Sequence, residues 1–516
     1  MTQTTRLGLL LLPAAVLLGL LGDALLRATP WGINILLWVG VLLGAGYWLA
    51  RRLDITLHGE GKWLAVPALL FAGGFAWRDS GTLRAVDFCG LLCCLGVGAA
   101  RTQVGQIRLA GLWDYFGEIV RSVFQSVFGV FPLLFRDIGW ETVPSRGWLP
   151  RVLAAGRGLL LVLPLLLLFG ALLTAADAVY QKLVLSVFHF DPAAFMGHFF
   201  LTLFVASLAA GFGRRLLLPL SDGPERLSKL PTLGVVETQT ILGFLNLLFL
   251  SFVLVQLRYF FGGAATVAST AGLTYTQYAR SGFFELVWVA ALVLPLLLSL
   301  HRLQDLGSLR ALRLFSAQAA VQVILLSVIL ASAMLRMKLY QDTCGLTELR
   351  LYTMAFMGWL AVVFVWFTLT VLRGRRPHFA FGAVVAAFAL IVGLHVLNPD
   401  ALIVRVNAAR TAATHTFDTD YAVSLSADAV PTLVAALPSL PPATQADVTA
   451  KLRPLWSKDE TDWRSWNWGR RSAFGDVHSR LGPLQASVPS LTKSASTDLV
   501  IASRQKVHNL RQGRTP

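Results

Sequence analysis

Two short segments in the last quarter of the chain have spacings that enzymes use. In HVLNPD, His395 and Asp400 have the His-x4-Asp spacing with which some acyltransferases place a histidine base near an acceptor hydroxyl. Pro399 breaks the helix end here and no phosphate-binding elements follow, so the spacing alone does not predict catalysis. In FDTDY, Asp418 and Asp420 could share a hard divalent cation, as in glycosyltransferases. Their position in the tail favours a solvated turn or a helix N-cap instead.

Four carboxylates, Asp23, Asp87, Glu237 and Glu285, lie in or beside long apolar runs. Ionisable groups are costly inside a membrane and often functional there. Glu237 stands at the start of its run, where a carboxylate complements the helix dipole, so we expect it to cap a helix. Glu285 follows Arg280 closely, so a structural ion pair or anchor is as well supported as a ligand site.

Polar residues near the ends of apolar runs form the best candidate site. Buried polar groups in membranes need partners, and hydrogen bonds between helices are their commonest use. Arginine and carboxylate side chains from different runs could also hold helix ends in register through paired hydrogen bonds. The predicted polar cluster comprises Asn246, Gln256, Arg258, Tyr278, Arg280, Glu285, Arg350 and Asp400.

Signatures of several enzyme classes do not occur in the sequence. There is no Walker Gly-x4-Gly-Lys-Ser/Thr, no His-Glu-x-x-His and no Gly-x-Ser-x-Gly. Cys89, Cys93 and Cys94 share one helical stretch, but no partnering His or Cys segment exists, so they are interpreted as small residues that ease helix packing. The tail has no cysteine for a disulfide framework or zinc knuckle. We therefore expect no metal and no cofactor.

The elements that must position these residues are long and apolar. Hydrophobic residues make up 55% of the chain and charged residues only 14%, against roughly 25% in a soluble domain. A spanning helix needs about 20 predominantly apolar residues. The sequence predicts an all-α polytopic transmembrane bundle of about eleven spans, at 7–26, 31–50, 63–77, 85–100, 158–176, 192–213, 238–257, 283–300, 314–335, 351–372 and 377–397.

Several stretches are less clear than the rest. Spans 63–77 and 85–100 are the weakest and could form a hairpin that only partly crosses the membrane. The segment 121–135 is too short to span and suits an interfacial or re-entrant helix. The uncharged segment 259–279 is rich in Gly, Ser and Thr, which favours an external connection. The segment 175–190 is amphipathic and is expected to lie on the surface.

The net charge of +16 carries information about orientation. Alternate connections, counted from the N-terminus, hold 21 Lys and Arg on one side against 9 on the other. The positive-inside rule then predicts a cytoplasmic N-terminus and an external tail. The connection 101–157 holds seven arginines and should attract anionic lipid. No dense basic stripe with interleaved aromatics is present, so we do not expect nucleic-acid binding.

The tail differs in composition from the spans. Prolines punctuate short amphipathic runs, and four tryptophans cluster at Trp456, Trp463, Trp466 and Trp468. We expect a small helical domain whose core the tryptophans fill, an aromatic belt at the lipid headgroups being the alternative. The predicted units are 1–100 (N-terminal hairpins), 101–157 (cytoplasmic connection), 158–398 (main bundle), 399–490 (external helical domain) and 491–516 (flexible tail).

Three segments, taken together, resemble a known family. They are TYTQYARSGFFELVWVAAL at 274–292, LTELRLYTMAFMGWLAVVFVWFTLTVLRGRRPHFAFG at 346–382 and LHVLNPDALIVRVNAAR at 394–410. They resemble the bacterial family called domain of unknown function four-one-five-three, or its sibling four-one-seven-three, as does YAVSLSADAVPTL at 421–433. The resemblance covers roughly residues 135–470, and the first four spans resemble no named family.

The resemblance implies a multi-pass membrane protein but no assigned activity. We expect the polar residues of its motifs to contact one another across helix ends: Tyr278, Arg280, Glu285, Arg350, Tyr352, Asn398, Asp400, Arg405 and Asn407. The leading hypothesis is a bacterial cytoplasmic-membrane protein that handles or transports a lipid, amphiphile or small solute. The alternatives are a membrane-embedded transferase acting on a lipid-linked substrate, and an envelope assembly or signalling partner that binds through the tail.

Overall fold

The computed structural model describes residues 2–102, 106–142, 192–218, 233–271, 283–303, 309–457 and 462–482, with a few positions between 158 and 177. Its regular elements within these ranges are helices. The predicted all-helical fold is therefore confirmed for the described part of the chain.

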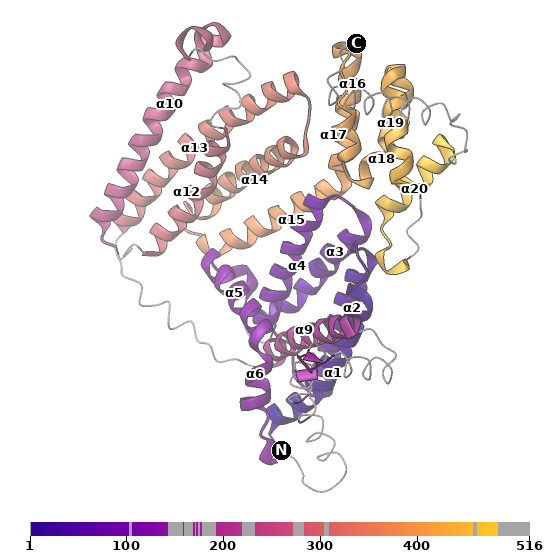
Figure 1. Ribbon diagram of the computed structural model, residues 1–516. Helices are drawn as coiled ribbons and strands as arrows, with labels where there is room; N and C mark the ends of the chain where they lie inside the picture. Colours follow the sequence, from indigo (N-terminus) through magenta and orange to yellow (C-terminus); the bar gives the residue numbers. More distant parts are fainter. Residues whose placement is uncertain are drawn as a thin grey trace, which may run out of the picture.

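The helices form two bundles and a terminal group (Figure 1). The first bundle contains α1 (Gln3–Leu26), α2 (Ile33–Arg52), α3 (Ala65–Trp77), α4 (Gly81–Arg101), α5 (Leu112–Phe128), α6 (Val130–Pro132) and α9 (Pro192–Leu217). The second contains α10 (Val235–Ala271), α12 (Phe283–Leu303), α13 (Leu309–Cys344) and α14 (Glu348–Thr370). The terminal group contains α16 (Pro399–Thr414), α17 (Thr419–Ser424), α18 (Val430–Ala436), α19 (Pro442–Leu455) and α20 (Trp468–Leu481).

Helix α15 (Phe379–Leu397) lies between the two bundles (Figure 1). Phe379 and Ala383 at its start belong to the apolar core of the second bundle. Phe388 and Ile391, further along, pack against the core formed by α2, α3 and α4. Leu394 joins the core of the terminal group. One apolar helix therefore contacts all three parts of the molecule.

Nine helices of the described residues are long and apolar enough to cross a membrane, or ten if α5 and the bent segment Val130–Asp137 after it form one span. The sequence predicted eleven. The predicted span 63–77 corresponds to α3, whose 13 residues measure about 20 Å, well short of the ~30 Å of hydrocarbon. Apart from a few positions between 158 and 177, the predicted span 158–176 and the amphipathic segment 175–190 lie outside the described residues.

Helix α5 and the segment Val130–Asp137 that follows it bend by 55° at Gly129, which is the geometry of a broken span or a re-entrant loop. The interfacial or re-entrant helix predicted over 121–135 stays a prediction. The bend coincides with a close crossing of α9. A Cβ atom on Gly129 would meet the Cα atom of Gly211 at 2.9 Å, and one on Gly211 would meet the backbone carbonyls of Gln125 and Ser126. Only glycine at both positions allows this contact between backbones.

Helix α10 corrects the prediction for the segment 259–279. The segment was predicted to be a connection, but α10 continues as a helix to Ala271. The part apolar enough to span is Val235–Gln256, so the extension lies beyond the candidate span. No proline interrupts this stretch, so the backbone hydrogen bonds of α10 can continue through its small residues.

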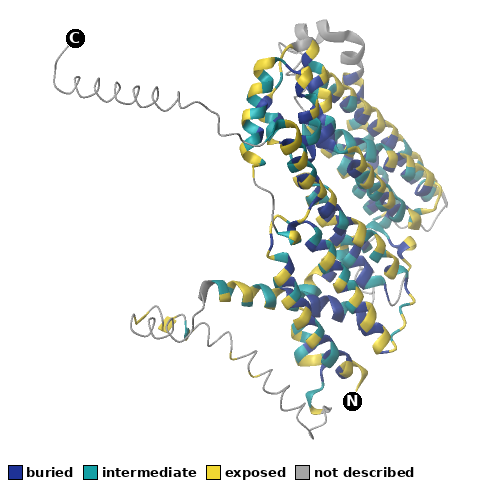
Figure 2. Ribbon diagram, turned by 90° about the vertical axis from the view of Figure 1, so that its right-hand side faces the viewer, coloured by how far each residue is buried: buried dark blue, intermediate teal, exposed yellow. Residues whose placement is uncertain are grey.

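The tryptophans of the tail are not its core. Trp463, Trp466 and Trp468 are exposed, and Trp456 is half-buried. The interior of the terminal group is instead aliphatic, with Leu433, Val448, Leu452 and Ala473 among its buried residues. Figure 2 shows exposed residues along the outer sides of the helices and buried residues within. The core prediction was wrong because three of these indoles stand on the short turn before α20 and at its start, where they point outward.

The two ends of the bundles differ in chemistry. At the arginine-rich end, Arg302 at the end of α12 pairs with Asp114 of α5 at 3.4 Å. Arg376, in the short turn η6 (Arg376–His378) before α15, lies 3.0 Å from the ring of His301 on α12. Arg101 pairs there with Glu118. At the junction end, the α1–α2 and α3–α4 loops meet the terminal group (Figure 1).

Candidate functional site at the junction of three helix groups

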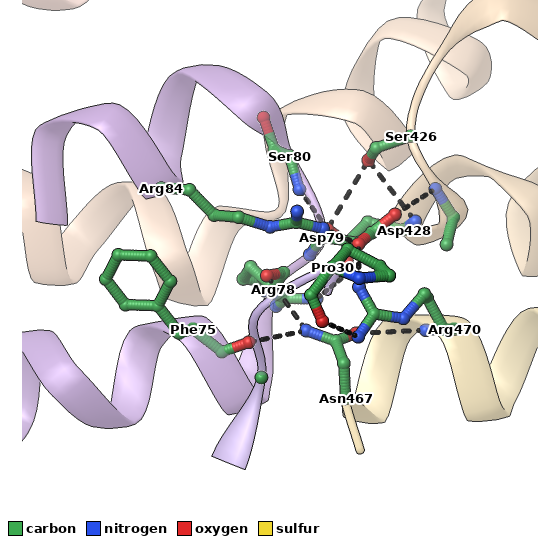
Figure 3. A network of polar contacts seen from close by, with 12 residues as sticks. Pro30, Phe75, Arg78, Asp79, Ser80, Arg84, Ser426, Asp428, Asn467 and Arg470 are labelled. Carbon is green, nitrogen blue, oxygen red and sulfur yellow. Dashed lines mark hydrogen bonds and ion pairs between the residues drawn. The ribbon is translucent and has the colours of Figure 1, made fainter. Parts of the chain in front are cut away.

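The polar junction is the network of contacts between the α3–α4 loop and the terminal group (Figure 3). Residues from far apart in the sequence supply it. The α3–α4 loop supplies Arg78, Asp79 and Ser80, and the start of α4 supplies Arg84. The terminal group supplies Ser426, Asp428, Asn467 and Arg470.

Asp428 is the central carboxylate of the polar junction and is buried. Its Oδ2 atom accepts hydrogen bonds from the backbone N–H groups of Asp79 (2.6 Å) and Ser80 (3.0 Å). The guanidinium of Arg78 lies 3.7 Å from Oδ1. Burial raises the pKa of Asp428, and the charge of Arg78 together with the hydrogen bonds opposes that rise. A carboxylate here therefore closes the α3–α4 loop against η7 (Ala427–Ala429).

Asp79 and Arg470 form the second tie across the polar junction. Arg470 donates from Nη1 to Asp79 Oδ1 at 2.7 Å, and Arg84 pairs with the same carboxylate. Arg470 is buried and also donates to the carbonyl of Ser465. Breaking such a buried pair leaves an uncompensated charge, so the pair fixes α20 against the first bundle.

Asn467 completes the contact of α20 with the first bundle. Its Nδ2 atom donates to the carbonyls of Phe75 (2.8 Å) and Arg78 (3.0 Å), at the end of α3. Carbonyls at a helix end have no partner within the helix, and Asn467 satisfies them from outside. Its Oδ1 atom caps α20 by accepting from the Arg470 N–H. The Trp466 carbonyl accepts from the Ile33 N–H at 3.0 Å, which adds the α1–α2 loop.

Asp400 lies fully buried beside the polar junction, in the first turn of α16. Its Oδ2 atom accepts from the Ser426 hydroxyl, whose oxygen lies 3.4 Å from Asp428. Burial raises the pKa of Asp400 to about 6, and the charges of Glu348 and Asp428 add to that rise. The Ser426 hydroxyl thus contacts two buried carboxylates, Asp400 and Asp428.

A buried pair lies inside the helices just below the polar junction. His395 of α15 and Asp87 of α4 approach to 3.0 Å between Nε2 and Oδ2. The other ring nitrogen, Nδ1, lies 2.9 Å from the Ile391 carbonyl. Arg78 donates from Nε to the backbone carbonyl of His395 at 2.8 Å. The same arginine therefore contacts both this pair and Asp428.

A cavity of about 600 Å³ opens where the α13–α14 loop meets α16 and α17. Its polar lining includes Arg350, Arg410 and Tyr421, and its apolar lining includes Ile403 and Val404. Arg350 stacks over the Tyr340 ring at 4.0 Å and donates to the Gly345 carbonyl. The cavity therefore combines two guanidinium groups with an aliphatic wall.

The rim of this cavity is fixed by the α13–α14 loop. Asn407 of α16 accepts from the Leu346 N–H and donates to the Leu346 carbonyl, both at 2.8 Å. Gly345 has a φ of +80°, and a Cβ there would meet Arg410 Nη1 at 2.5 Å. The position therefore requires glycine.

The residues of the predicted polar cluster fall into different places. Asn246 donates to the Gln318 carbonyl of α13 at 3.1 Å, and Gln256 accepts from Ser332 of the same helix at 2.5 Å. Both therefore tie α10 to α13 as hydrogen bonds between helices. Figure 1 places α10 and α16 at opposite sides of the molecule.

Two members of the predicted cluster, Arg350 and Asp400, both lie near Tyr421. Tyr421 lines the cavity with Arg350, and the charges of Arg350 and Asp400 both act on its hydroxyl. Glu285 is exposed at the start of α12. Tyr278, Arg280 and the side chain of Arg258 lie outside the described residues. The complete cluster stays a prediction.

Two capping predictions are confirmed. Asp418 is the N-cap of α17 and accepts from the Tyr421 N–H at 2.9 Å. Glu237, in the first turn of α10, accepts from the Gly234 N–H at 2.6 Å. Asp420 pairs with Lys451 on the surface at 2.7 Å. Among the described residues, no three His, Cys, Asp or Glu side chains lie close enough together to hold a metal ion.

Sequence reasoning did not single out most of the polar junction. Asp428 lies within YAVSLSADAVPTL, one of the segments of the family resemblance, but nothing local marks it as buried. The best available signal was Arg78 and Asp79, which stand alone between two apolar runs. A charged pair in so short a loop has few partners within its own hairpin and favours a distant one.

The comparisons with known proteins give one match. The family model described as domain of unknown function (DUF4153) matches residues 65–436. This range begins earlier than the resemblance predicted and takes in α3 and α4. It includes Asp87, His395, Asp400 and Asp428 but not α20. No curated protein and no solved structure matches the chain.

Proposed function

We propose that this chain, which belongs to the family described as domain of unknown function (DUF4153), binds a membrane amphiphile with an anionic headgroup. The headgroup would lie in the cavity between the α13–α14 loop and α16. The observation that carries the proposal is the pair of arginines, Arg350 and Arg410, lining one cavity at the start of a candidate span.

The lining suits an anionic headgroup. A guanidinium has five N–H donors in a fixed fork that matches carboxylate and phosphate oxygens. Arg350 spends a donor on the Gly345 carbonyl, which leaves further donors for a ligand. Asp418, the acidic residue of the lining, already accepts from the Tyr421 N–H as a helix cap. Phosphate and carboxylate headgroups are therefore the expected class.

The surroundings suit a hydrocarbon tail. Helix α14 begins at the cavity and exposes Leu349 and Phe356, which are seven residues apart and share one face of the helix. An amphiphile could place its headgroup on the arginines and its chain along this face. The aliphatic wall formed by Ile403 and Val404 would contact the first carbons of the chain.

The proposed setting is the bacterial cytoplasmic membrane with the cavity on the outer side. The charge count along the sequence supports this orientation, because the connections at the arginine-rich end hold most of the Lys and Arg. The exposed tryptophans of the tail, Trp463, Trp466 and Trp468, suit the headgroup level on the outer side. Handling or transport of the amphiphile is the activity we propose for this site.

A lipid titration tests the proposal. The purified full chain in neutral detergent would be titrated with phosphatidylglycerol, phosphatidylcholine or inorganic phosphate, and thermal stability measured. We expect phosphatidylglycerol to raise the melting temperature more than phosphatidylcholine. A response to inorganic phosphate alone would identify a free anion rather than a lipid as the ligand, and would overturn the amphiphile.

Matched variants localise the effect. Arg410→Gln removes a guanidinium from the cavity, whereas Arg405→Gln removes an exposed one from the same helix. We expect the preference for phosphatidylglycerol to fall at least tenfold in apparent affinity for Arg410→Gln and to persist for Arg405→Gln. Equal responses of the two variants, or equal responses to the two lipids, would show that the cavity is not the site.

A further inference from the structure

The pair formed by Asp87 and His395 has a hydrogen-bond geometry that fixes its number of protons. The Ile391 carbonyl can only accept, so His395 Nδ1, 2.9 Å away, carries a hydrogen. Nε2 then faces Asp87 Oδ2 at 3.0 Å. Two lone pairs would repel at this distance, so a proton lies between the two atoms. It belongs either to an imidazolium or to a carboxylic acid.

Both arrangements leave the pair with no net charge. That is the state that burial favours, because Asp87 and His395 expose only 1% and 6% of their side chains. Loss of the shared proton would leave one negative charge among apolar helices. Asp87 Oδ1 receives no hydrogen bond from the described part of the chain, so the remaining charge would have little local support.

The backbone of α3 is shaped to admit this pair. A Cβ atom on Gly74 would lie 2.2 Å from Asp87 Oδ2 and 2.9 Å from His395 Nε2. The neighbouring Gly73 has nothing within 4 Å of such an atom. The shared proton therefore lies against Gly74, where any side chain would push the pair apart. Gly73, one residue away, offers a matched control.

Arg78 is the charged group that faces the pair from outside. It donates to the His395 carbonyl, and its charge acts on the His395 ring. Helix α3 has no titratable side chain, and α15 has only His395. The other titratable groups on neighbouring elements lie along α4, toward the polar junction or toward the arginine-rich end. They are Arg84, Cys89, Cys93 and Cys94 on α4; Asp79, Glu348, Arg350, Tyr352, Asp400, Arg405, Arg410, Asp428 and Arg470 toward the junction; and Glu60, Lys62, Arg101, Arg108, Asp114, Tyr115, Glu118, Arg121, Arg376 and His378 toward the other end.

Arg78 also connects the pair to the polar junction. Its guanidinium lies 3.7 Å from Asp428 Oδ1, while Asp428 holds the N–H groups of Asp79 and Ser80. A negative charge appearing on the Asp87–His395 pair would attract Arg78 away from Asp428. The hydrogen bonds between Asp428 of the terminal group and the α3–α4 loop would then weaken.

We propose that Asp87 and His395 form a proton-binding site within the membrane helices, and that Arg78 links occupancy of this site to closure of the polar junction. The ligand is a single proton shared by Nε2 and Oδ2. The site is separate from the cavity and does not depend on the proposed amphiphile.

Spectroscopy on the full chain tests the proton count. Histidine labelled with ¹⁵N reports whether Nε2 is protonated, and His395→Gln identifies the signal among the nine histidines. Infrared difference spectra between wild type and Asp87→Asn report whether Asp87 is an acid or a carboxylate. At pH 8, above the ordinary histidine pKa of about 6.5, either a protonated Nε2 with a carboxylate or an unprotonated Nε2 with an acid supports the site. An unprotonated Nε2 together with a carboxylate overturns it.

Two glycine variants test the location. We expect Gly74→Ala to change the His395 signal and Gly73→Ala to leave it at the wild-type position. The proposed site is wrong if both variants keep the wild-type signal. Asp87→Asn can donate to Nε2 without a mobile proton, so it retains the geometry if a Gly74 variant fails to fold.

Hydrogen exchange tests the link to the polar junction. In Asp87→Asn the site no longer holds a mobile proton, so raising the pH from 6 to 9 should not alter the relative protection of the peptide containing Asp79 and Ser80. In wild type, proton loss at high pH should lower that protection at least tenfold beyond the intrinsic pH effect, relative to Asp87→Asn. Identical pH profiles in the two proteins would refute the link through Arg78.

Discussion

The described residues include two aspartate–histidine pairs between candidate membrane-spanning helices, and the surroundings of the two pairs differ. Asp87 and His395 join α4 to α15 at 3.0 Å, with 1% and 6% of their side chains exposed. Asp23 and His198 join α1 to α9 at 2.5 Å, with 15% and 51% exposed. Arg27 lies 3.7 Å from Asp23 and supplies a second cation there.

The comparison teaches that burial, and not the pair itself, decides the consequence of a proton. At the exposed pair, solvent and Arg27 can compensate either charge state. At the buried pair, Asp87 exposes only 1% of its side chain and pairs with no Lys or Arg of the described residues, so gain or loss of a proton must be compensated by movement. Only the buried pair is therefore suited to couple protonation to structure.

The largest expected effect separates the two pairs directly. Asp87→Ala leaves His395 buried without its partner and should lower the free energy of unfolding by about 3–5 kcal/mol. Asp23→Ala leaves a half-exposed histidine and should cost about 0–1 kcal/mol. Denaturant unfolding of the two variants in detergent measures the difference. Similar losses of unfolding free energy in the two variants would mean that burial of a pair does not decide its contribution to stability.

A second prediction concerns Asp400, a buried carboxylate outside the spans. Its folded-state pKa of about 6 lies above the ordinary 3.8, so the native state binds more protons than the unfolded state between about pH 4 and 6. The free energy of unfolding should therefore fall as pH rises through this window, by up to about 3 kcal/mol. Asp400→Asn should show a smaller fall over the same window. Parallel pH profiles would contradict the raised pKa.

The third effect is steric. Gly74→Ala inserts a methyl group against the buried pair and should destabilise the protein by about 1–3 kcal/mol. Gly73→Ala faces open space and should be neutral or slightly stabilising, because alanine is the better helix former. Thermal unfolding of both variants checks this. Equal losses would place the pair elsewhere.

The smallest effect per residue is expected for exposed arginines that attract anionic lipid. Arg108, Arg121 and Arg136 are exposed beside the exposed aromatic residues of α5 and η3 (Leu133–Asp137). Each should contribute about 1 kcal/mol to binding of anionic lipid before screening by salt. Vesicle binding of single and triple Gln variants, with and without salt, measures this. Binding that ignores both the substitutions and the salt would exclude lipid attraction by these arginines.

Parts of the fold could be read from local pattern. Apolar runs predict helices because a membrane helix satisfies its backbone within one segment. Glu237 and Asp418 were recognised as caps because capping involves residues three apart. The helical extension to Ala271 and the outward tail tryptophans were missed, since a small-residue run and an aromatic cluster each suit two environments.

By itself, the sequence determined the membrane class, most of the helices and the family. Only the tertiary structure decided which charged residues meet. Asp87 and His395 are 308 residues apart, and Asp428 lies 349 residues from the backbone N–H of Asp79. Hydrophobic patterning is set by neighbours three and four residues away, whereas any of several carboxylates could have faced a given cation. The packing of α15 between the bundles settles that choice, because it brings the ends of α3, α4 and α16 together at one junction.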